Sequence, residues 1–228
     1  MSQSNGPDYA KARRLLMRRD PVLGAVIKHI GACRMADRQR GDHFSTLVSA
    51  IVSQQLSTKA AATIFGRLAA LCPGGAVTLP ADLDGLSDDQ LRSVGLSRQK
   101  VSYIRDLCGR LADGRLNLDD LETLDDEQVV ERLTSVKGFG RWTAEMFLMF
   151  RLHRPDVLPV GDLGIVTAMQ RVYRLRARPK PERALKIGEA WRPYRSVASW
   201  YLWQSLKNEP SATAEQTPRR SRSASRAR

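Results

Sequence analysis

The sequence of 228 residues predicts an all-α fold. Apolar residues recur at the three- and four-residue spacing of a helix face along most of the chain, and we find no useful length of the alternation that marks a strand. Two segments, 86–96 and 124–139, each place a glycine turn after a short helical pattern and before a longer one. A chain of this length can bury a proper core without disulfides or metals.

The first helix is predicted to begin after Asp20 and to run through Ile30. Aspartate is a favoured N-cap, and Pro21 suits the first helical position because its missing N–H has no partner there in any helix. Residues 1–19, which are rich in arginine, are expected to form a separate basic segment before the main domain, which spans 20–206.

A second amphipathic helix is expected around residues 44–52. Its apolar face consists of Phe44, Leu47, Val48, Ile51 and Val52. The polar stretch 53–57 interrupts the pattern, and Ser57 is a suitable cap for the next helix, Lys59 to Leu71. Residues 73–75 and Pro80 bound the loop that follows.

The second glycine turn, residues 136–140, is predicted to bind phosphate. It holds two glycines, Gly138 and Gly140, whereas the turn around Gly95 holds one and is interpreted as a structural relative. Glycines allow the backbone to come close to a ligand. The first amides of the helix after the turn are unpaired and lie at the positive end of its dipole, which favours a phosphate oxygen.

The helix after this turn begins near Trp142, and Asp162 follows Trp142 by twenty residues. Asp162 precedes a helix predicted over 163–172, so it is interpreted as a helix cap, as a carboxylate available for chemistry, or as both. Its neighbours Gly161 and Gly164 are expected to leave room for a nucleotide. A last helix is predicted from Gly188 onward. Its apolar residues are Trp191, Val197, Trp200, Leu202 and Trp203.

The charge of the chain indicates a polyanionic partner. Lysine and arginine outnumber aspartate and glutamate by 37 to 24, which gives a formal net charge of +13. No apolar run reaches membrane-spanning length and no apolar leader is present at the N-terminus, so nucleic acid is favoured over a membrane. From Lys207 the composition predicts a disordered Arg/Ser-rich tail, 207–228, whose five arginines add nonspecific DNA affinity.

Three motifs carry a resemblance to a known family. SQQLST at 53–58, VKGFGRWTA at 136–144 and PVGDLGI at 159–165 occur in the order of the helix-hairpin-helix DNA glycosylases of the GPD type, and most closely resemble DNA-3-methyladenine glycosylase II. The resemblance implies a two-lobed helical bundle with a DNA-binding cleft between the lobes. It also implies hydrolysis of the N-glycosidic bond of alkylated purines, 3-methyladenine and 7-methylguanine, flipped out of duplex DNA to leave an abasic site.

The resemblance makes Asp162 the catalytic residue. A carboxylate there stabilises the oxocarbenium character that develops at C1′, or orients and deprotonates the attacking water. Asp156 is offset from the family's position and is expected to have a surface or capping role. Trp142 stands where bifunctional relatives carry a Schiff-base lysine, which implies a monofunctional enzyme without lyase activity.

The resemblance also implies a base pocket and a wedge. Trp142 and Trp203 would stack on the extruded purine, whose positive charge an aromatic face attracts. Met146 and Leu163 belong to the same pocket, at positions where closer bacterial relatives have tyrosines. The wedge that fills the gap in the base stack is Gln55 or the neighbouring Leu56, for which ordinary core packing is an equal alternative.

Two groups of hairpin atoms are implied to contact DNA. The phosphate-binding residues are Lys137, Gly138, Phe139 and Gly140. The backbone carbonyls of Thr134, Val136 and Phe139 would hold a structural Na+ or K+. No other cofactor is expected, and an iron–sulfur cluster is not, because no cysteine follows Cys108.

Two alternatives stay open: a glycosylase for another damaged or mismatched base, and a noncatalytic helix-hairpin-helix DNA-binding protein. The placement of Asp162 favours an enzyme, because binding alone does not need it. The expected partner is double-stranded DNA with alkylated bases, and the chain is expected to act as a monomer. The expected location is the bacterial cytoplasm, at the nucleoid, or the nucleus of a eukaryote.

Overall fold

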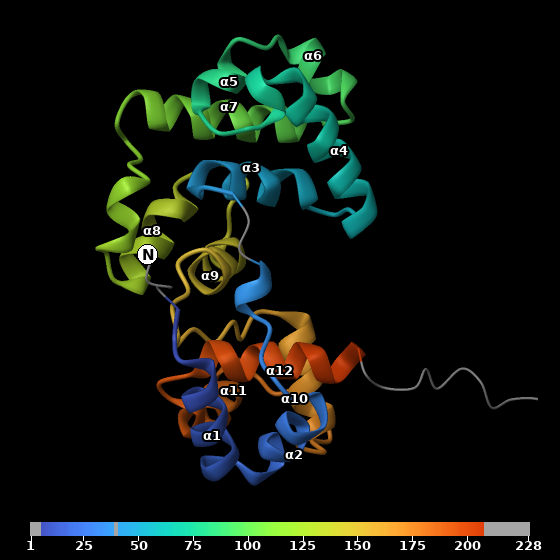
Figure 1. The fold of residues 1–228 in the computed structure, drawn as a ribbon, viewed down its shortest axis with the longest axis vertical. Helices are drawn as coiled ribbons and strands as arrows, with labels where there is room; N and C mark the ends of the chain where they lie inside the picture. Colours follow the sequence, from blue (N-terminus) through green and yellow to red (C-terminus); the bar gives the residue numbers. More distant parts are fainter. Residues whose placement is uncertain (1–5, 39–40, 208–228) are drawn as a thin grey trace, which may run out of the picture.

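A computed structural model describes residues 6–38 and 41–207, and this part of the chain is helical without any strand. Figure 1 shows two lobes. The lower lobe contains α1 (Tyr9–Arg19), α2 (Pro21–Ile30), α10 (Leu163–Val172), α11 (Pro181–Gly188) and α12 (Arg195–Lys207). The upper lobe contains α3 (His43–Ser53), α4 (Thr58–Leu71), α5 (Pro80–Asp84), α6 (Asp88–Ser93), α7 (Arg98–Ala112), α8 (Asp126–Thr134) and α9 (Arg141–Phe150). The all-α prediction is confirmed.

In the lower lobe, helices from the beginning and the end of the described chain pack against one another. Helix α12 packs against α2 and α10, and α1 packs against α2. The expectation that residues 1–19 precede the first helix is wrong, because α1 is a helix capped by Asp8 and buries Ala12 and Leu16 completely. The segment therefore contributes to the core of this lobe, and its arginines occupy the other faces of α1.

Asp20 caps α2 as predicted, since its Oδ1 accepts a hydrogen bond from the Leu23 N–H at 3.0 Å. Its Oδ2 accepts from the Trp191 indole at 2.8 Å and from the Tyr173 hydroxyl. The prediction of one helix from Gly188 onward is corrected: α11 ends there, the short 3-10 turn η4 (Glu189–Trp191) follows, and α12 begins at Arg195. Pro193 separates them because it cannot donate the N–H that a continuous helix needs.

The upper lobe follows the sequence pattern closely. The five apolar residues predicted for α3 are all buried, and the Ser57 hydroxyl accepts from the Ala60 N–H to cap α4. The predicted loop contains a single 3-10 turn, η2 (Pro73–Gly75), before α5 begins at Pro80. None of the helices in the described ranges is long and apolar enough to span a membrane.

The two similar segments predicted from the sequence form matching helix pairs, α6 with α7 and α8 with α9. Each first helix begins with a capping box, Ser87 with Gln90 and Asp125 with Gln128. Each turn contains a glycine with positive φ, +110° at Gly95 and +82° at Gly138. Both turns therefore use a backbone conformation that side-chain-bearing residues rarely adopt.

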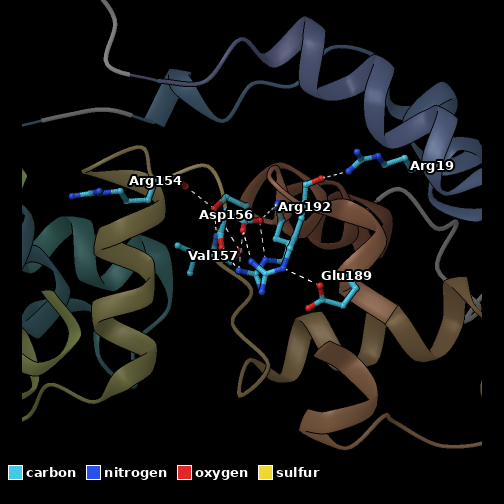
Figure 2. A network of polar contacts seen from close by, with 8 residues as sticks. Arg19, Arg154, Asp156, Val157, Glu189 and Arg192 are labelled. Carbon is cyan, nitrogen blue, oxygen red and sulfur yellow. Dashed lines mark hydrogen bonds and ion pairs between the residues drawn. The ribbon is translucent and has the colours of Figure 1, made fainter. Parts of the chain in front are cut away.

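A polar network fixes the segment that runs from α9 to α10 (Figure 2). The Asp156 carboxylate pairs with Arg192 at 2.8 Å and with Arg195 at 2.8 Å, and it accepts the Arg195 backbone N–H at 3.3 Å. Asp156 thus has the capping role expected for it, at the start of α12. The Ser196 hydroxyl adds bonds to the backbone of this segment, so the path toward α10 is anchored on α12.

Candidate active site and nucleic-acid interface

Asp162 lies at the N-terminus of α10 and its carboxylate receives three N–H groups. Its Oδ1 accepts from the backbone of Ile165 at 2.8 Å and from the indole of Trp203 at 2.9 Å. Its Oδ2 accepts from the indole of Trp142 at 2.7 Å. Asp162 is therefore the helix cap that one interpretation predicted. The same bonds hold its carboxylate in a fixed position between two aromatic side chains.

The two indoles come from different lobes. Trp142 is in the first turn of α9, in the upper lobe, and Trp203 is in α12, in the lower lobe. The Trp203 ring stacks on Phe150 with ring centroids 5.8 Å apart and an interplanar angle of 28°. Trp142 remains 50% exposed although its indole N–H is bonded, so part of its side chain is open to solvent. Asp162 thus lies where the lobes meet.

A cavity of about 480 Å³ lies beside Trp142, between α3 and α9. Its walls include Trp142, Met146 and Phe150 from α9, Ser49 from α3, and Gln54 and Gln55 from the turn after α3. Three of the residues predicted from the sequence, Trp142, Met146 and Gln55, therefore share one cavity, and Trp203 adjoins it through Phe150. The cavity therefore has both an aromatic wall and a polar wall.

Leu163 and the flanking glycines differ from expectation. Leu163 does not line the cavity and is 62% exposed, because its side chain lies on the solvent side of the first turn of α10. A Cβ on Gly164 would lie 2.9 Å from the Asp162 Oδ1 and 3.1 Å from the Trp203 ring. Gly164 therefore makes room for Trp203 and not for a nucleotide, whereas the space beside Gly161 is open.

The wedge candidates lie in the turn between α3 and α4. Gln55 is exposed, has a φ of +56° that is uncommon for a residue with a side chain, and lines the cavity. Leu56 is 39% exposed, so the core-packing alternative for it is wrong, and it lines a separate groove between α3 and α4. Of the two candidates, Gln55 is thus the one that lines the cavity beside Trp142.

The hairpin turn is seated on α7. A Cβ on Gly138 would lie 2.2 Å from the Tyr103 ring, so only glycine fits the turn against this side chain. The Lys137 N–H donates to the Asp106 carboxylate at 2.9 Å, and the Phe139 N–H donates to the Val136 carbonyl at 3.1 Å. The first bond attaches the turn to α7, and the second closes the turn on itself.

The hairpin residues predicted to bind phosphate differ in whether their N–H groups are free. Within the described part of the chain, the N–H groups of Gly138 and Gly140 have no hydrogen-bond partner, as phosphate binding requires. The N–H groups of Lys137 and Phe139 are already used and the Phe139 side chain is buried, so neither amide is available to phosphate. Of these two residues, Lys137 alone keeps a group for phosphate, its exposed side chain.

The carbonyls proposed to bind a cation can also be located. Those of Thr134 and Phe139 accept no hydrogen bond from the described residues, and that of Val136 accepts one. Side chains offer no alternative nearby, since residues 6–38 and 41–207 contain no group of three histidine, cysteine or acidic residues suited to a metal. Carbonyl oxygens are suitable ligands for a hard cation such as Na+ or K+.

Sequence reasoning missed a buried carboxyl, Glu145, one turn after Trp142 in α9. Its side chain is 8% exposed, and the nearby Arg141 is paired with Glu127 at 2.7 Å. Burial raises the pKa of Glu145 to about 7, Arg141 lowers it, and the charges of Glu127 and Asp162 raise it further. An acidic residue inside an apolar helical run was the signal available in the sequence.

A family of known proteins matches more than half of this chain. The model of the HhH-GPD superfamily of base excision DNA repair proteins matches residues 48–193. DNA-3-methyladenine glycosylase 1 of Schizosaccharomyces pombe is 34% identical over 184 residues, which are 80% of this chain and 81% of that protein.

Two solved structures are similar over most of the chain. A DNA-3-methyladenine glycosidase from Bacillus halodurans has a TM-score of 0.77 and 39% identity, covering 86% of this chain and 89% of its own. A 3-methyladenine DNA glycosylase from Schizosaccharomyces pombe in complex with abasic DNA has a TM-score of 0.77 and 33% identity, covering 86% of this chain and 97% of its own.

Proposed function

This chain belongs to the HhH-GPD superfamily of base excision DNA repair proteins, and from that premise we propose that Asp162 is the carboxylate with which it hydrolyses N-glycosidic bonds of alkylated purines. The protein is a DNA glycosylase of the 3-methyladenine type and binds DNA. One observation carries the assignment of Asp162: its carboxylate is held by indoles from both lobes, and one of them, Trp142, lines a cavity with aromatic walls.

The proposed reaction uses Asp162 at the sugar. The bond between C1′ and the purine nitrogen breaks, its electron pair leaves with the base, and positive charge develops on the sugar ring. A carboxylate fixed by N–H donors stabilises that charge without reorganising, and it can accept a proton from the water that attacks C1′. The products are the free base and an abasic site in the DNA strand.

The chemistry of alkylated purines and the aromatic wall of the cavity support the proposed base preference. Methylation at N3 of adenine or N7 of guanine gives the base a positive charge, so it leaves without prior protonation. The ring of Trp142 attracts a cation more strongly than a neutral base. No lysine lines the cavity, so hydrolysis is proposed without a covalent imine between protein and sugar.

The DNA is proposed to be held by the hairpin and opened by the wedge. The free amides of Gly138 and Gly140 bind one phosphate, and Gln55 enters the stack where the purine has left it. The carbonyls of Thr134, Val136 and Phe139 would hold a Na+ or K+ at the same turn. A monomer suffices, because both walls of the site come from one chain.

The assignment is tested by Asp162→Asn. Asparagine caps helices about as well as aspartate, so α10 should remain folded while the negative charge at the sugar is lost. Base release under single-turnover conditions should fall at least about a hundredfold, and affinity for duplex DNA should stay within about twofold. Asp8→Asn, which changes the cap of α1 in the same way, is the matched control and should retain activity.

The base preference is tested with duplexes that each carry one lesion: 3-methyladenine, 7-methylguanine, uracil or a mismatch. Release of the methylated purines, with an abasic strand left intact, is expected. Release of uracil or of a mismatched base alone would contradict the proposed specificity.

The two tests have separate outcomes. Full base release by Asp162→Asn would remove Asp162 from the mechanism and would leave the base preference unaffected.

A further inference from the structure

One helix, α7, contacts both elements proposed to touch DNA. Lys100, Tyr103 and Asp106 are spaced one turn apart and therefore share a face of α7. The Lys100 ammonium donates to the Val52 carbonyl at 2.8 Å, in the last turn of α3. The Tyr103 ring lies against Gly138, and Asp106 accepts the Lys137 N–H.

Gln54 links these two elements directly. Its side-chain Nε2 donates to the Gly138 carbonyl at 2.8 Å, across 84 positions of sequence. The N–H of the same peptide unit, that of Phe139, donates to the Val136 carbonyl. The peptide between Gly138 and Phe139 is therefore held at both ends, once by the hairpin itself and once by Gln54.

The turn after α3 has few other attachments. Its remaining hydrogen bonds are local, from the Gln54 N–H to the Ile51 carbonyl and from the Leu56 N–H to the Ser53 carbonyl. Among the described residues, only the Lys100 and Gln54 bonds connect residues 52–57 to distant parts of the chain. Gln55, with its unusual φ, directly follows the second of these attachments.

We propose that Gln54 is a positioning residue that keeps Gln55 in register with the phosphate-binding hairpin. Binding of a phosphate at Gly138 and Gly140 then fixes how far Gln55 stands from the base stack. This inference rests on the proposed function, because it takes Gln55 as the wedge. Gln54 acts through its neighbour and through the hairpin carbonyl and does not touch the reacting atoms.

The test replaces Gln54 by methionine, which has nearly the same length but no donor and no charge. Gln170→Met is the matched control, because the Gln170 amide also donates to a backbone carbonyl, that of Arg176, in a different part of the molecule. Three quantities are measured: affinity for an undamaged duplex, fluorescence of a duplex with 2-aminopurine at the target position, and the single-turnover rate of 3-methyladenine release at saturating enzyme.

Gln54→Met should keep its affinity for the undamaged duplex within about twofold of the unsubstituted protein. Its 2-aminopurine signal and single-turnover rate should fall by up to about tenfold, the factor that one hydrogen bond to a fixed carbonyl can contribute. Lys100→Met should likewise keep its affinity for the undamaged duplex while its 2-aminopurine signal and single-turnover rate fall. Lys100→Arg, which retains a donor, should recover most of the rate.

Two outcomes would overturn the inference. A loss of undamaged-duplex affinity with an unchanged rate at saturation would make Gln54 a simple DNA contact. If Gln54→Met and Gln170→Met gave the same three values, Gln54 would have no special role in positioning Gln55. The fluorescence measurement is repeated in the Asp162→Asn background. Because it reports extrusion of the base and not its release, its result does not depend on the role of Asp162 in the chemistry.

Discussion

Glu145 is a residue whose protonation links the stability of the protein to pH. It is buried in α9, one turn from Trp142, and the neighbouring guanidinium of Arg141 is already paired with Glu127. Burial raises its pKa from 4.5 to about 7. The folded protein therefore holds a proton here that the unfolded chain releases at lower pH.

Replacing Glu145 by glutamine should stabilise the protein, and more so at high pH. The folded state binds the extra proton between pH 4.5 and 7, so the free energy of unfolding of the parent falls as pH rises through this interval and stays reduced above it. Glu145→Gln avoids this loss. Its advantage should be near zero at pH 4.5 and reach about 1–3 kcal/mol at pH 8 in urea unfolding.

The control for this prediction is Glu127→Gln. The hydrogen-bonded ion pair with Arg141 lowers the pKa of Glu127 in the folded protein. The ionised Glu127 therefore stabilises the protein above the pKa that it has in the unfolded chain, and this stabilisation is lost as pH falls. Its substitution should therefore be slightly destabilising at pH 8, the opposite sign to Glu145→Gln. A difference between Glu145→Gln and the parent that does not change with pH would contradict the interpretation of Glu145.

At the scale of elements, the contact of the hairpin turn with α7 should matter for DNA binding as much as the glycines of the turn do. Gly138→Ala should force the turn away from Tyr103, because a Cβ would lie 2.2 Å from the ring, and it also strains a backbone with φ of +82°. We expect about a tenfold loss of affinity for an undamaged duplex, measured by fluorescence anisotropy, together with a lower melting temperature.

The second variant for this prediction combines Gly138→Ala with Tyr103→Ala, which removes the clash but not the backbone strain. It should recover part of the lost affinity. Gly109→Ala serves as the control, because this exposed position of α7 has no atom within 4 Å of an added Cβ. That substitution should stabilise the helix by roughly 0.5–1 kcal/mol and leave DNA binding unchanged. If Gly138→Ala kept full affinity for the undamaged duplex, the contact between the hairpin turn and α7 would have no role in DNA binding.

Elements defined by local patterns could be predicted from the sequence. The caps at Asp20 and Ser57, the buried face of α3 and the paired glycine turns follow from residues a few positions apart. Contacts between distant residues left no such pattern. Neither the bond from Trp203 to Asp162 nor the face of α7 beneath the hairpin was foreseen. Helix α1 was missed because four arginines and a lysine interrupt its apolar residues.

At the scale of the whole molecule, charge should govern how tightly any duplex is held. The predicted disordered tail lies almost entirely outside the described residues, and its segment 208–228 carries five arginines and two glutamates. Deleting this segment should reduce the slope of log affinity against log salt for an undamaged duplex, by up to about 4 if every arginine contacts phosphate. The single-turnover rate at saturating enzyme should not change. An unchanged slope would exclude the tail from DNA binding.

The two indole bonds to Asp162 have a consequence for motion between the lobes. Trp142 and Trp203 approach the carboxylate from opposite halves of the molecule, so any hinge opening at this junction must pull at least one of them away. The carboxylate of Asp162 would then lose one of the hydrogen bonds that fix its position. If Asp162 performs the chemistry as proposed, a duplex that keeps the halves apart should lose its base more slowly than one around which both indoles stay bonded to the carboxylate.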